Sequence, residues 1–365
     1  MGIPSAKVRN QGMIEGLNRI GYAAVMLGER ELSNGYESFA AMREQAKFPF
    51  VSANFVYEDD GSPVVDPYVI QTVHRKDRDI RVALLGLNRY NTGFLKSTAA
   101  GKNIVVASPF RTANKVVPEL RSKADVVVVL TSLSISQCRQ LAKQVEGIDL
   151  IIGAQGGVVS KLTERENGVP IVFPGNQGKR LSEIRMSFDS DGHVSVFRSL
   201  HYLNRDYPVD PELQQMVLDV LAEENAINRE RASAEVPQPV IPAGVASYIG
   251  AETCGTCHQE ALEAWRASAH SHAFQTLIDH NQDFSAECVS CHTVGQGRKG
   301  GFVNAKATPA LVDVQCESCH GPGSLHAATP KKGYGAAGAR SCLGCHDPEN
   351  SPEFDFYAFW PKIQH

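Results

Sequence analysis

The 365-residue sequence has no apolar run of about 18 residues or more, and it has no large excess of charge of either sign. A membrane-spanning helix needs about 20 predominantly apolar residues, so we expect no membrane span. The 36 Lys and Arg side chains against 40 Asp and Glu give a formal net charge of −4. A protein that binds nucleic acid normally carries a basic patch, so this balance argues against nucleic acid as a partner.

Sulfur-containing residues are scarce in some parts of the chain. Before residue 250 the only cysteine is Cys138, which we interpret as a small apolar core residue, and after Met216 there is no methionine. The other eight of the nine cysteines lie in residues 250–365, together with 8 basic and 12 acidic side chains. The whole net charge therefore belongs to this segment, and the length allows about two domains.

Residues 1–231 have the pattern of an α/β domain, in which short apolar runs alternate with helix-length segments. Strands are expected at Ala23–Leu27, Phe50–Asn54, Ile80–Leu87, Asp125–Leu130, Asp149–Ile152, Ile171–Phe173, Glu183–Phe188 and Val194–Ser199, with a turn at residues 189–192. Helices are expected at Tyr36–Lys47, Thr112–Ser122, Ser136–Glu146 and Pro211–Arg231. We therefore predict a layered α/β sandwich.

A proline-rich linker is predicted at residues 232–246, because Pro237, Pro239 and Pro242 cannot continue a helix. The third segment, residues 247–365, has weak apolar periodicity and many Gly, Cys and His residues. It has too few aliphatic side chains for an ordinary core, so we expect something other than protein inside it.

The motif C-x-x-C-H occurs four times in this third segment, and it is the attachment signature of c-type haem. Two thiols bind the haem vinyl groups, and the adjacent histidine becomes the proximal iron ligand. Zinc modules also use paired cysteines, but they do not need a histidine after each pair. The motifs predict four haem c groups, attached by Cys254, Cys257, Cys288, Cys291, Cys316, Cys319, Cys342 and Cys345, with proximal ligands His258, His292, His320 and His346.

The second axial ligand of each iron decides whether that iron only carries electrons or also binds a substrate. The segment has no methionine, so the distal ligands are expected among its five remaining histidines. We predict His270, His272, His326 and His365, with His280 as the alternative. His270 and His272 lie two positions apart and so point to different sides of a helix, where they would serve two haems.

The third segment resembles the tetrahaem cytochrome c554 family over about residues 247–365. The resemblance lies in Tyr248-Ile249-Gly250 before the first motif, in Trp265 to His272 after it, in the stretch from Cys316 through His326, and in the closing Trp360 to His365. It implies a mostly helical, haem-packed domain that relays electrons. In the best-known member one haem lacks a distal ligand, whereas this chain has the additional His270.

The first domain resembles the 5′-nucleotidase branch of the calcineurin-like metallophosphoesterases over about residues 10–205. The matching segments are Tyr22–Leu27 with Gly28–Glu31, Phe50–Phe55, Asp125–Ser134 and Ile148–Gly156. Their order and spacing agree with the family. The resemblance implies a two-metal hydrolase fold.

The metal ligands of that family are not matched. Glu29 and Arg30 stand where the family has Gly-Asn-His-Glu, Ser132 replaces the histidine of the middle motif, and Ala154 and Gly156 replace both histidines of the last. Two-metal hydrolysis depends on such ligands. We therefore expect a phosphoesterase-like scaffold that has lost its site, and we predict that the chain is not an enzyme.

The first residues, Met1–Ile20, lack the apolar region of a signal peptide. Covalent haem attachment takes place outside the cytoplasm, so we nevertheless expect the protein to be exported, to the periplasm or the cell surface. The family's first two metal motifs would lie upstream of residue 10. We therefore expect that the natural amino terminus is missing and that the phosphoesterase-like domain is incomplete.

These features predict a multihaem electron carrier that docks basic redox partners, because its haem domain is acidic. A ligand such as His365 would join a haem of the next chain if the protein assembles into filaments. Two alternatives remain. One is a haem enzyme with one open iron that acts on a small nitrogen oxide, and the other is a phosphoesterase with an attached cytochrome.

Overall fold

The computed structural model describes residues 4–76, 78–90, 97–99, 101–154, 158–160, 163–176, 178–188, 194–204, 206–233, 240–347, 350–351 and 353–365. The chain folds into two compact units. Residues 10–214 form the first unit, and residues 4–9 with 215–365 form the second. Helices α1 (Pro4–Ile20) and α5 (Pro211–Ser233) contribute residues to both.

The first unit is built on a six-stranded sheet with the order β10-β11-β9-β8-β5-β4. Its strands are β4 (Tyr68–His74), β5 (Asp79–Leu87), β8 (Val126–Thr131), β9 (Leu150–Gly153), β10 (Glu164–Glu166) and β11 (Val169–Val172). The four central strands are parallel, and the edge strands β4 and β10 pair antiparallel. Parallel strands need crossover connections, which here include helices α3 (Pro109–Lys123) and α4 (Ile135–Gln144).

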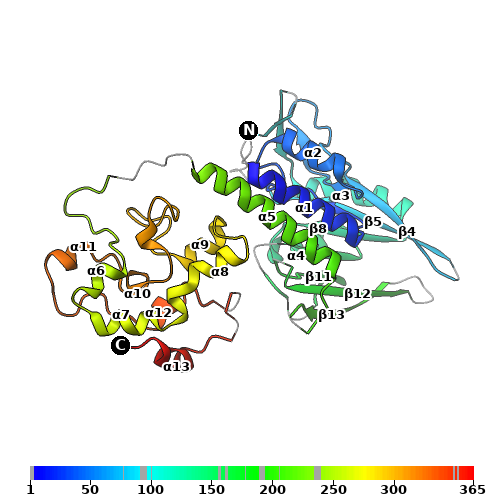
Figure 1. Ribbon diagram of the computed structural model, residues 1–365. Coiled ribbons are helices and arrows are strands. Elements are labelled where there is room, and N and C mark those ends of the chain that lie inside the picture. Colours follow the sequence, from blue (N-terminus) through cyan, green and yellow to red (C-terminus); the bar gives the residue numbers. More distant parts are fainter. Residues whose placement is uncertain are drawn as a thin grey trace. The chain divides into compact units, whose positions relative to one another are not determined.

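The two faces of this sheet are covered by different elements, because alternate side chains of a strand point to opposite faces. On one face, Leu85 and Val129 pack with Val117 of α3 and Leu141 of α4. On the other face, the central strands pack against β12 (Arg180–Phe188) and β13 (Val194–Tyr202), which form an antiparallel pair. The result is a layered sandwich of helices, sheet and hairpin (Figure 1).

A separate core forms beside the sandwich. It joins α1, α2 (Tyr36–Gln45), the parallel pair β1 (Val25–Met26) and β2 (Phe50–Val51), and the sheet of β3 (Phe55–Tyr57), β6 (Ser97–Ala99) and β7 (Lys102–Val106). Phe39 and Phe50 pack edge to face in it, with ring centres 5.2 Å apart. This core therefore holds β1, β2 and their following loops next to the main sheet.

The second unit consists of short helices and loops (Figure 1). Its helices after α5 are α6 (Ala251–Gly255), α7 (Gln259–Arg266), α8 (Ala273–Asp279), α9 (Ala286–His292), α10 (Cys316–His320), α11 (Ser324–Ala328), α12 (Ala339–Cys342) and α13 (Phe356–Phe359), with single 3₁₀ turns at Ala269–His272, Pro309–Leu311 and Trp360–Lys362. Its one described cluster of buried apolar residues contains Phe274, Leu277, Val289, Val294, Phe302 and Leu311. This small cluster agrees with the scarcity of aliphatic residues in the sequence.

The predicted fold class is confirmed: a layered α/β sandwich is followed by a mostly helical region. The apolar runs expected as strands do form strands, most of them within two residues of the predicted bounds. Helix α1 and strands β3, β4, β6, β7 and β10 were not predicted, and the turn predicted at residues 189–192 lies outside the described residues. In the described ranges, no helix has the length and apolar character needed to cross a membrane.

Candidate haem-binding sites

Each C-x-x-C-H motif lies on or beside a short helical turn. Residues three positions apart on a helical turn share a face, so the two thiols of a motif lie side by side. In the first motif, the backbone N–H groups of Cys257 and His258 both donate to the carbonyl of Cys254, at 3.2 and 3.0 Å. Cys345 and His346 donate in the same way to Cys342, at 3.1 and 2.9 Å. All nine cysteines of the chain are free thiols in this structure.

Three of the proximal histidines are oriented by a hydrogen bond at Nδ1. His292 donates to the carbonyl of Ala273 at 2.6 Å, and His320 donates to the carbonyl of Gly335. The Nδ1 atom of His346 lies 3.0 Å from Ser351 Oγ. Metal-binding histidines commonly use one ring nitrogen in this way, which fixes the ring and leaves Nε2 for the metal. These three rings are therefore prepared to bind iron through Nε2.

Three proximal histidines each face one of the predicted distal histidines. The ring centres of His258 and His326 lie 6.3 Å apart. Those of His270 and His346 lie 6.1 Å apart, and those of His320 and His365 lie 6.0 Å apart. Each pair joins residues from different motifs or segments of the unit, which the sequence alone could not pair.

The geometry around His292 is different. Among the residues that the structure describes, His292 makes no ring contact with a second imidazole, although Asp313 lies near both His272 and His292. The adjacent 3₁₀ turn carries His272, but its neighbour Ala273 bonds to the Nδ1 side of His292, away from Nε2. His272 and His280 are both exposed, and their predicted roles as ligands remain predictions.

The attachment cysteines of different motifs also lie close to one another. The thiols of Cys254 and Cys316 are neighbours, and their interaction raises the pKa of Cys254 and lowers the pKa of Cys316 to about 7. Burial, together with the neighbouring Cys291 thiol, raises the pKa of Cys345 to about 12. Burial and then the proximity of Cys342 raise the pKa of Cys319. The first motif is thus adjacent to the third, the third to the fourth, and the fourth to the second.

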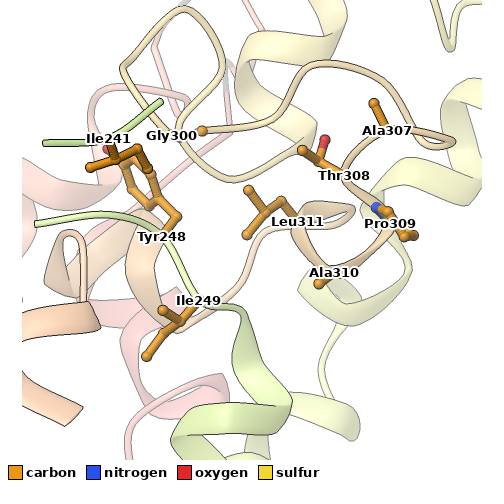
Figure 2. Close-up of a pocket in the computed structure, with 10 residues that line it drawn as sticks. Ile241, Tyr248, Ile249, Gly300, Ala307, Thr308, Pro309, Ala310 and Leu311 are labelled. Atoms are coloured by element: carbon orange, nitrogen blue, oxygen red, sulfur yellow. The ribbon is translucent and has the colours of Figure 1, made fainter. Parts of the chain in front are cut away.

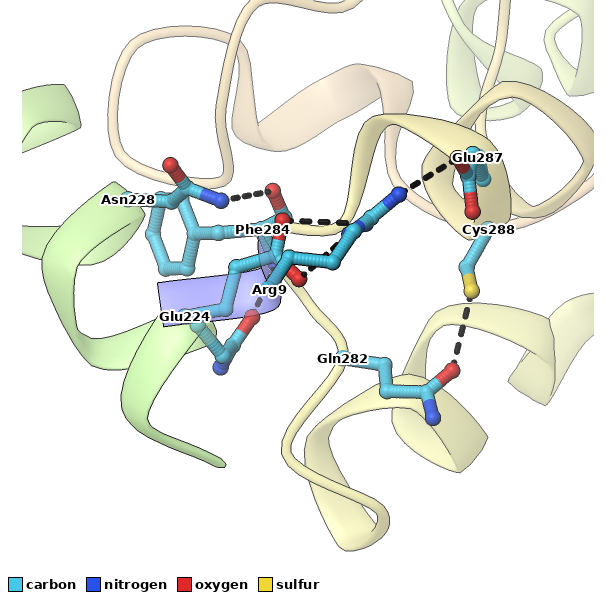
Figure 3. Close-up of polar contacts among 8 residues, drawn as sticks. Arg9, Glu224, Asn228, Gln282, Phe284, Glu287 and Cys288 are labelled. Atoms are coloured by element: carbon cyan, nitrogen blue, oxygen red, sulfur yellow. Dashed lines mark hydrogen bonds and ion pairs between the residues drawn. The ribbon is translucent and has the colours of Figure 1, made fainter. Parts of the chain in front are cut away.

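Helix α5 is attached to the segment that precedes the second motif. Asn225 is buried, with 3% of its surface exposed, and it donates to Asp283 at 2.8 Å while accepting from the N–H of Phe284 at 2.8 Å. Arg9 joins Glu224 to Glu287, at 2.9 and 2.8 Å. Figure 3 shows Arg9 between Glu224 and Glu287 and, beside them, Cys288, whose thiol donates to Gln282 at 2.9 Å. The sequence analysis did not single out Asn225, because a polar residue on a helix gives no sign of a distant partner.

A pocket of about 280 Å³ lies in the same unit, between residues 241–249 and 300–311 (Figure 2). Its walls are mostly apolar side chains and backbone, including Ile241, Ile249 and Leu311. Tyr248 is the only titratable residue of the ten that line it. No Asp, Glu, His, Cys, Lys or Arg side chain is among these ten residues.

In the first unit, several loops meet at the carboxyl ends of the parallel strands. The side chain of Asn88, which follows β5, donates to the carbonyl of Leu27 at 2.9 Å and to Ser52 Oγ at 3.0 Å. Ser132, which follows β8, accepts from the N–H of Arg89 at 2.9 Å. Asn54 is fully buried and accepts from the N–H of Asn88 at 2.7 Å. This network holds the residue 28–31 loop, Ser132 and the end of β5 together.

That edge is where the sequence resemblance places the metal ligands of the phosphoesterases. In the described part of the chain, no group of three or more His, Cys, Asp or Glu side chains is arranged to hold a metal ion. Ala154 follows β9 there, and Gly156 lies outside the described residues. The loop carrying Glu29 and Arg30 is fixed by Glu31, which accepts from the N–H of Gly28 at 2.9 Å.

Comparison with known proteins confirms the resemblance of the second unit. Residues 253–321 match the protein family described as "Cytochrome c554 and c-prime". Cytochrome c-554 from Nitrosomonas europaea is 34% identical over 93 residues, which are 21% of this chain and 40% of that protein. The second unit is therefore similar to a haem electron-transfer protein.

The first unit is similar to phosphoesterases. A 2′,3′-cyclic-nucleotide 2′-phosphodiesterase/3′-nucleotidase from Yersinia enterocolitica is 28% identical over 203 residues, or 48% of this chain and 31% of that protein. The calcineurin-like phosphoesterase YfkN from Bacillus subtilis has the same fold, with a TM-score of 0.51 and 20% identity over 62% of this chain and 77% of the other. The chain spans less than half the length of these two curated relatives.

These matches contradict the prediction that the chain is not an enzyme. The residues of the first unit align with proteins named as nucleotidases and phosphodiesterases, which favours an enzymatic activity. The prediction relied on the replacement of the family's metal ligands, most of which are histidines. Hard divalent cations also bind carboxylate, amide and carbonyl oxygens, so the loss of histidines is no proof that a hydrolytic site is lost.

Proposed function

We propose that the second unit binds four c-type haems and transfers electrons among them and to partner proteins. The observation that carries the proposal is the spacing of the three histidine pairs, 6.0 to 6.3 Å between ring centres. A metal–imidazole bond is about 2 Å long, and the bonded nitrogen lies about 1 Å from its ring centre. Two rings on opposite sides of one iron are thus about 6 Å apart, as in these pairs.

The four attachment sites then form a row rather than a cluster. Contacts between Cys254 and Cys316, between Cys319 and Cys342, and between Cys345 and Cys291 support the order first, third, fourth and second. Bound haem iron takes up and releases one electron at a time. The row therefore has two ends, at the first and second motifs, where a donor and an acceptor would dock.

The partners are proposed to carry basic docking surfaces. Residues 250–365 contain 12 acidic and 8 basic side chains, and haem propionates would add further negative charge. We also propose that the protein works in the periplasm or at the cell surface, where c-type haem is attached. Self-assembly through His365 remains a prediction, and the pairing of His365 with His320 in one chain supports ligation within the chain.

The number of haems can be measured directly on the exported protein. Intact mass and a pyridine haemochrome assay are expected to give four covalent haems per chain. Replacement of Cys342 and Cys345 by serine is expected to give three. A wild-type value below four would contradict the proposal, as would a variant that still carries four.

A second candidate function concerns the haem of the second motif. Since no described imidazole makes a ring contact with His292, this iron would be open to a small ligand, as a haem enzyme acting on a nitrogen oxide requires. Adding nitric oxide to the reduced protein tests this candidate. Binding of one equivalent per chain is expected, and no binding would exclude it.

A third candidate is phosphoester hydrolysis by the first unit, which its nucleotidase relatives support. Cyclic 2′,3′-nucleotides and 3′-nucleotides would be tested with Mn²⁺ or Zn²⁺ added to the full chain. Release of phosphate or of a 3′-nucleotide that stops on chelation is expected. A rate equal to that of the metal ion alone would rule this candidate out.

A further inference from the structure

Glu317 is a buried carboxylate within the third C-x-x-C-H motif. It lies on α10 between Cys316 and Cys319, and only 4% of its surface is exposed. A glutamate is rarely buried so completely unless its charge is compensated. The groups that compensate the charge of Glu317 therefore indicate its role.

Three backbone N–H groups bind this carboxylate. Gly250 and Ile249 donate to Oε2 at 2.8 and 2.9 Å, and Gly323 donates to Oε1 at 2.7 Å. No cation is paired with Glu317 among the described residues. Since all three partners are donors, both oxygens act as acceptors, which is the arrangement of an ionised carboxylate. Its charge is therefore balanced by backbone dipoles and not by a positive side chain.

The glycines at these positions allow the close approach. Gly250 has a φ of +82°, in the left-handed region, and an added Cβ would lie 2.7 Å from the carbonyl oxygen of Ala310. A Cβ on Gly323 would lie 3.2 Å from Glu317 Oε1. A side chain at Gly250 would be strained and crowded, and one at Gly323 would press on the carboxylate.

The carboxylate connects two haem-attachment segments. Gly250 caps helix α6, which carries Cys254 of the first motif, whereas Glu317 belongs to the third. The neighbouring Gln315 reinforces the connection, because its side-chain oxygen accepts from the N–H of Ala251 at 2.5 Å. Burial and then the charge of Glu317 raise the pKa of Tyr334, so the negative charge also acts beyond these hydrogen bonds.

We propose that Glu317 is a positioning residue that fixes the first motif against the third and, through its buried charge, lowers the reduction potentials of the two haems attached there. This inference rests on the proposed function. Reduction adds one electron to each ferric iron and so removes one positive charge near the carboxylate. A buried negative charge stabilises the ferric state, and the effect is larger away from water than at the surface.

The test replaces Glu317 by Gln, which is similar in shape but uncharged, in the full haem-loaded chain. Redox titration is expected to show that two of the four midpoint potentials are higher than in the wild-type protein. The expected rise of each is about 59 mV, which corresponds to a tenfold change in a one-electron reduction equilibrium. The matched control is Glu252→Gln. Glu252 also lies near Cys254, but its side chain is 74% exposed and paired with Arg266, so a much smaller shift is expected.

The possible results separate this inference from the function on which it rests. Fewer than four haems in the wild-type protein would contradict the proposed function itself. Four haems in Glu317→Gln with midpoints equal to those of wild type would overturn the role of the charge. Glu317→Asp keeps the charge on a shorter side chain, and it is expected to load four haems with nearly unchanged midpoints. If the Glu317→Gln variant fails to load haem and the Glu317→Asp variant loads it, the requirement for the charge is supported. If both variants fail to load haem, Glu317 is needed for folding and the proposed role of its charge is overturned.

Discussion

The rings of His270 and His346 lie 6.1 Å apart, although one follows the first haem motif and the other completes the fourth. Burial, and secondly the nearby His346, lowers the pKa of His270. A neutral imidazole is the form that binds a metal. The two rings are thus correctly spaced to hold one iron between them, and the lowered pKa of His270 favours its neutral form.

His270→Ala is expected to convert one low-spin haem of the four to the high-spin form, because His346 would lose its opposing ligand. Electron paramagnetic resonance of the ferric protein measures this change. His280→Ala is the matched control, since His280 is exposed and faces no other described imidazole. An unchanged spectrum for His270→Ala, with all haems attached, would remove His270 from the ligand set.

His365→Ala is expected to act on a different haem, the one held by His320. One further haem should become high-spin, and the double variant with His270→Ala should give two. The same spectra measure the additivity, which is expected because the two pairs share no residue. If His365 instead binds a haem of another chain, its loss should reduce the size of the particle in solution.

Carbon monoxide is expected to bind the reduced wild-type protein at one haem per chain, the haem of His292. The reason is that no described imidazole makes a ring contact with His292. The Soret shift measures the stoichiometry, and His270→Ala should bind a second equivalent. Complete resistance of the wild-type protein to carbon monoxide would mean that a further residue closes this iron.

Asn225→Ala is expected to destabilise the second unit by about 1–3 kcal/mol, because it leaves the buried Phe284 N–H without its acceptor and removes one of the donors to Asp283. Denaturant unfolding, followed by the haem absorbance, measures the loss. Asn228→Ala serves as the control, since Asn228 makes only one long bond to Phe284, at 3.5 Å. Equal losses for the two variants would contradict a specific role for Asn225.

Cys138 is expected to be the only reactive thiol of the haem-loaded chain, and only after unfolding. Burial raises its pKa to about 12, so almost none of it is thiolate at pH 8. A thiol reagent should detect none in the native protein and one per chain in guanidinium chloride. More than one would mean that some motif cysteines carry no haem.

The sequence predicted the strands of the main sheet well because each is a short apolar run between polar residues, as at Val126–Thr131. It missed Tyr68–His74 because this edge strand is only partly buried and lacks such a run. Helix Pro4–Ile20 was also not predicted, because these first residues were considered only as part of a possible signal peptide. An edge strand without a clear apolar run or a clear alternation is thus difficult to predict from the sequence.

The haem motifs could be predicted because all their parts lie within five consecutive residues. The pairing of histidines could not, since His258 and His326 are brought together only by the fold. Glu317 is similar: its motif is conspicuous, but its three donors come from two other segments. A site formed by neighbouring residues could be predicted from the sequence, whereas a site that the fold assembles from separate segments could not.

The three histidine pairs overlap along the chain and are not nested. The loop from 258 to 326 encloses His270 and His320, whose partners both lie beyond it. Iron bound in these pairs would act as three interlocked cross-links, each restricting the unfolded chain as a disulfide does. The third cross-link, between His320 and His365, would close only when the chain extends to His365.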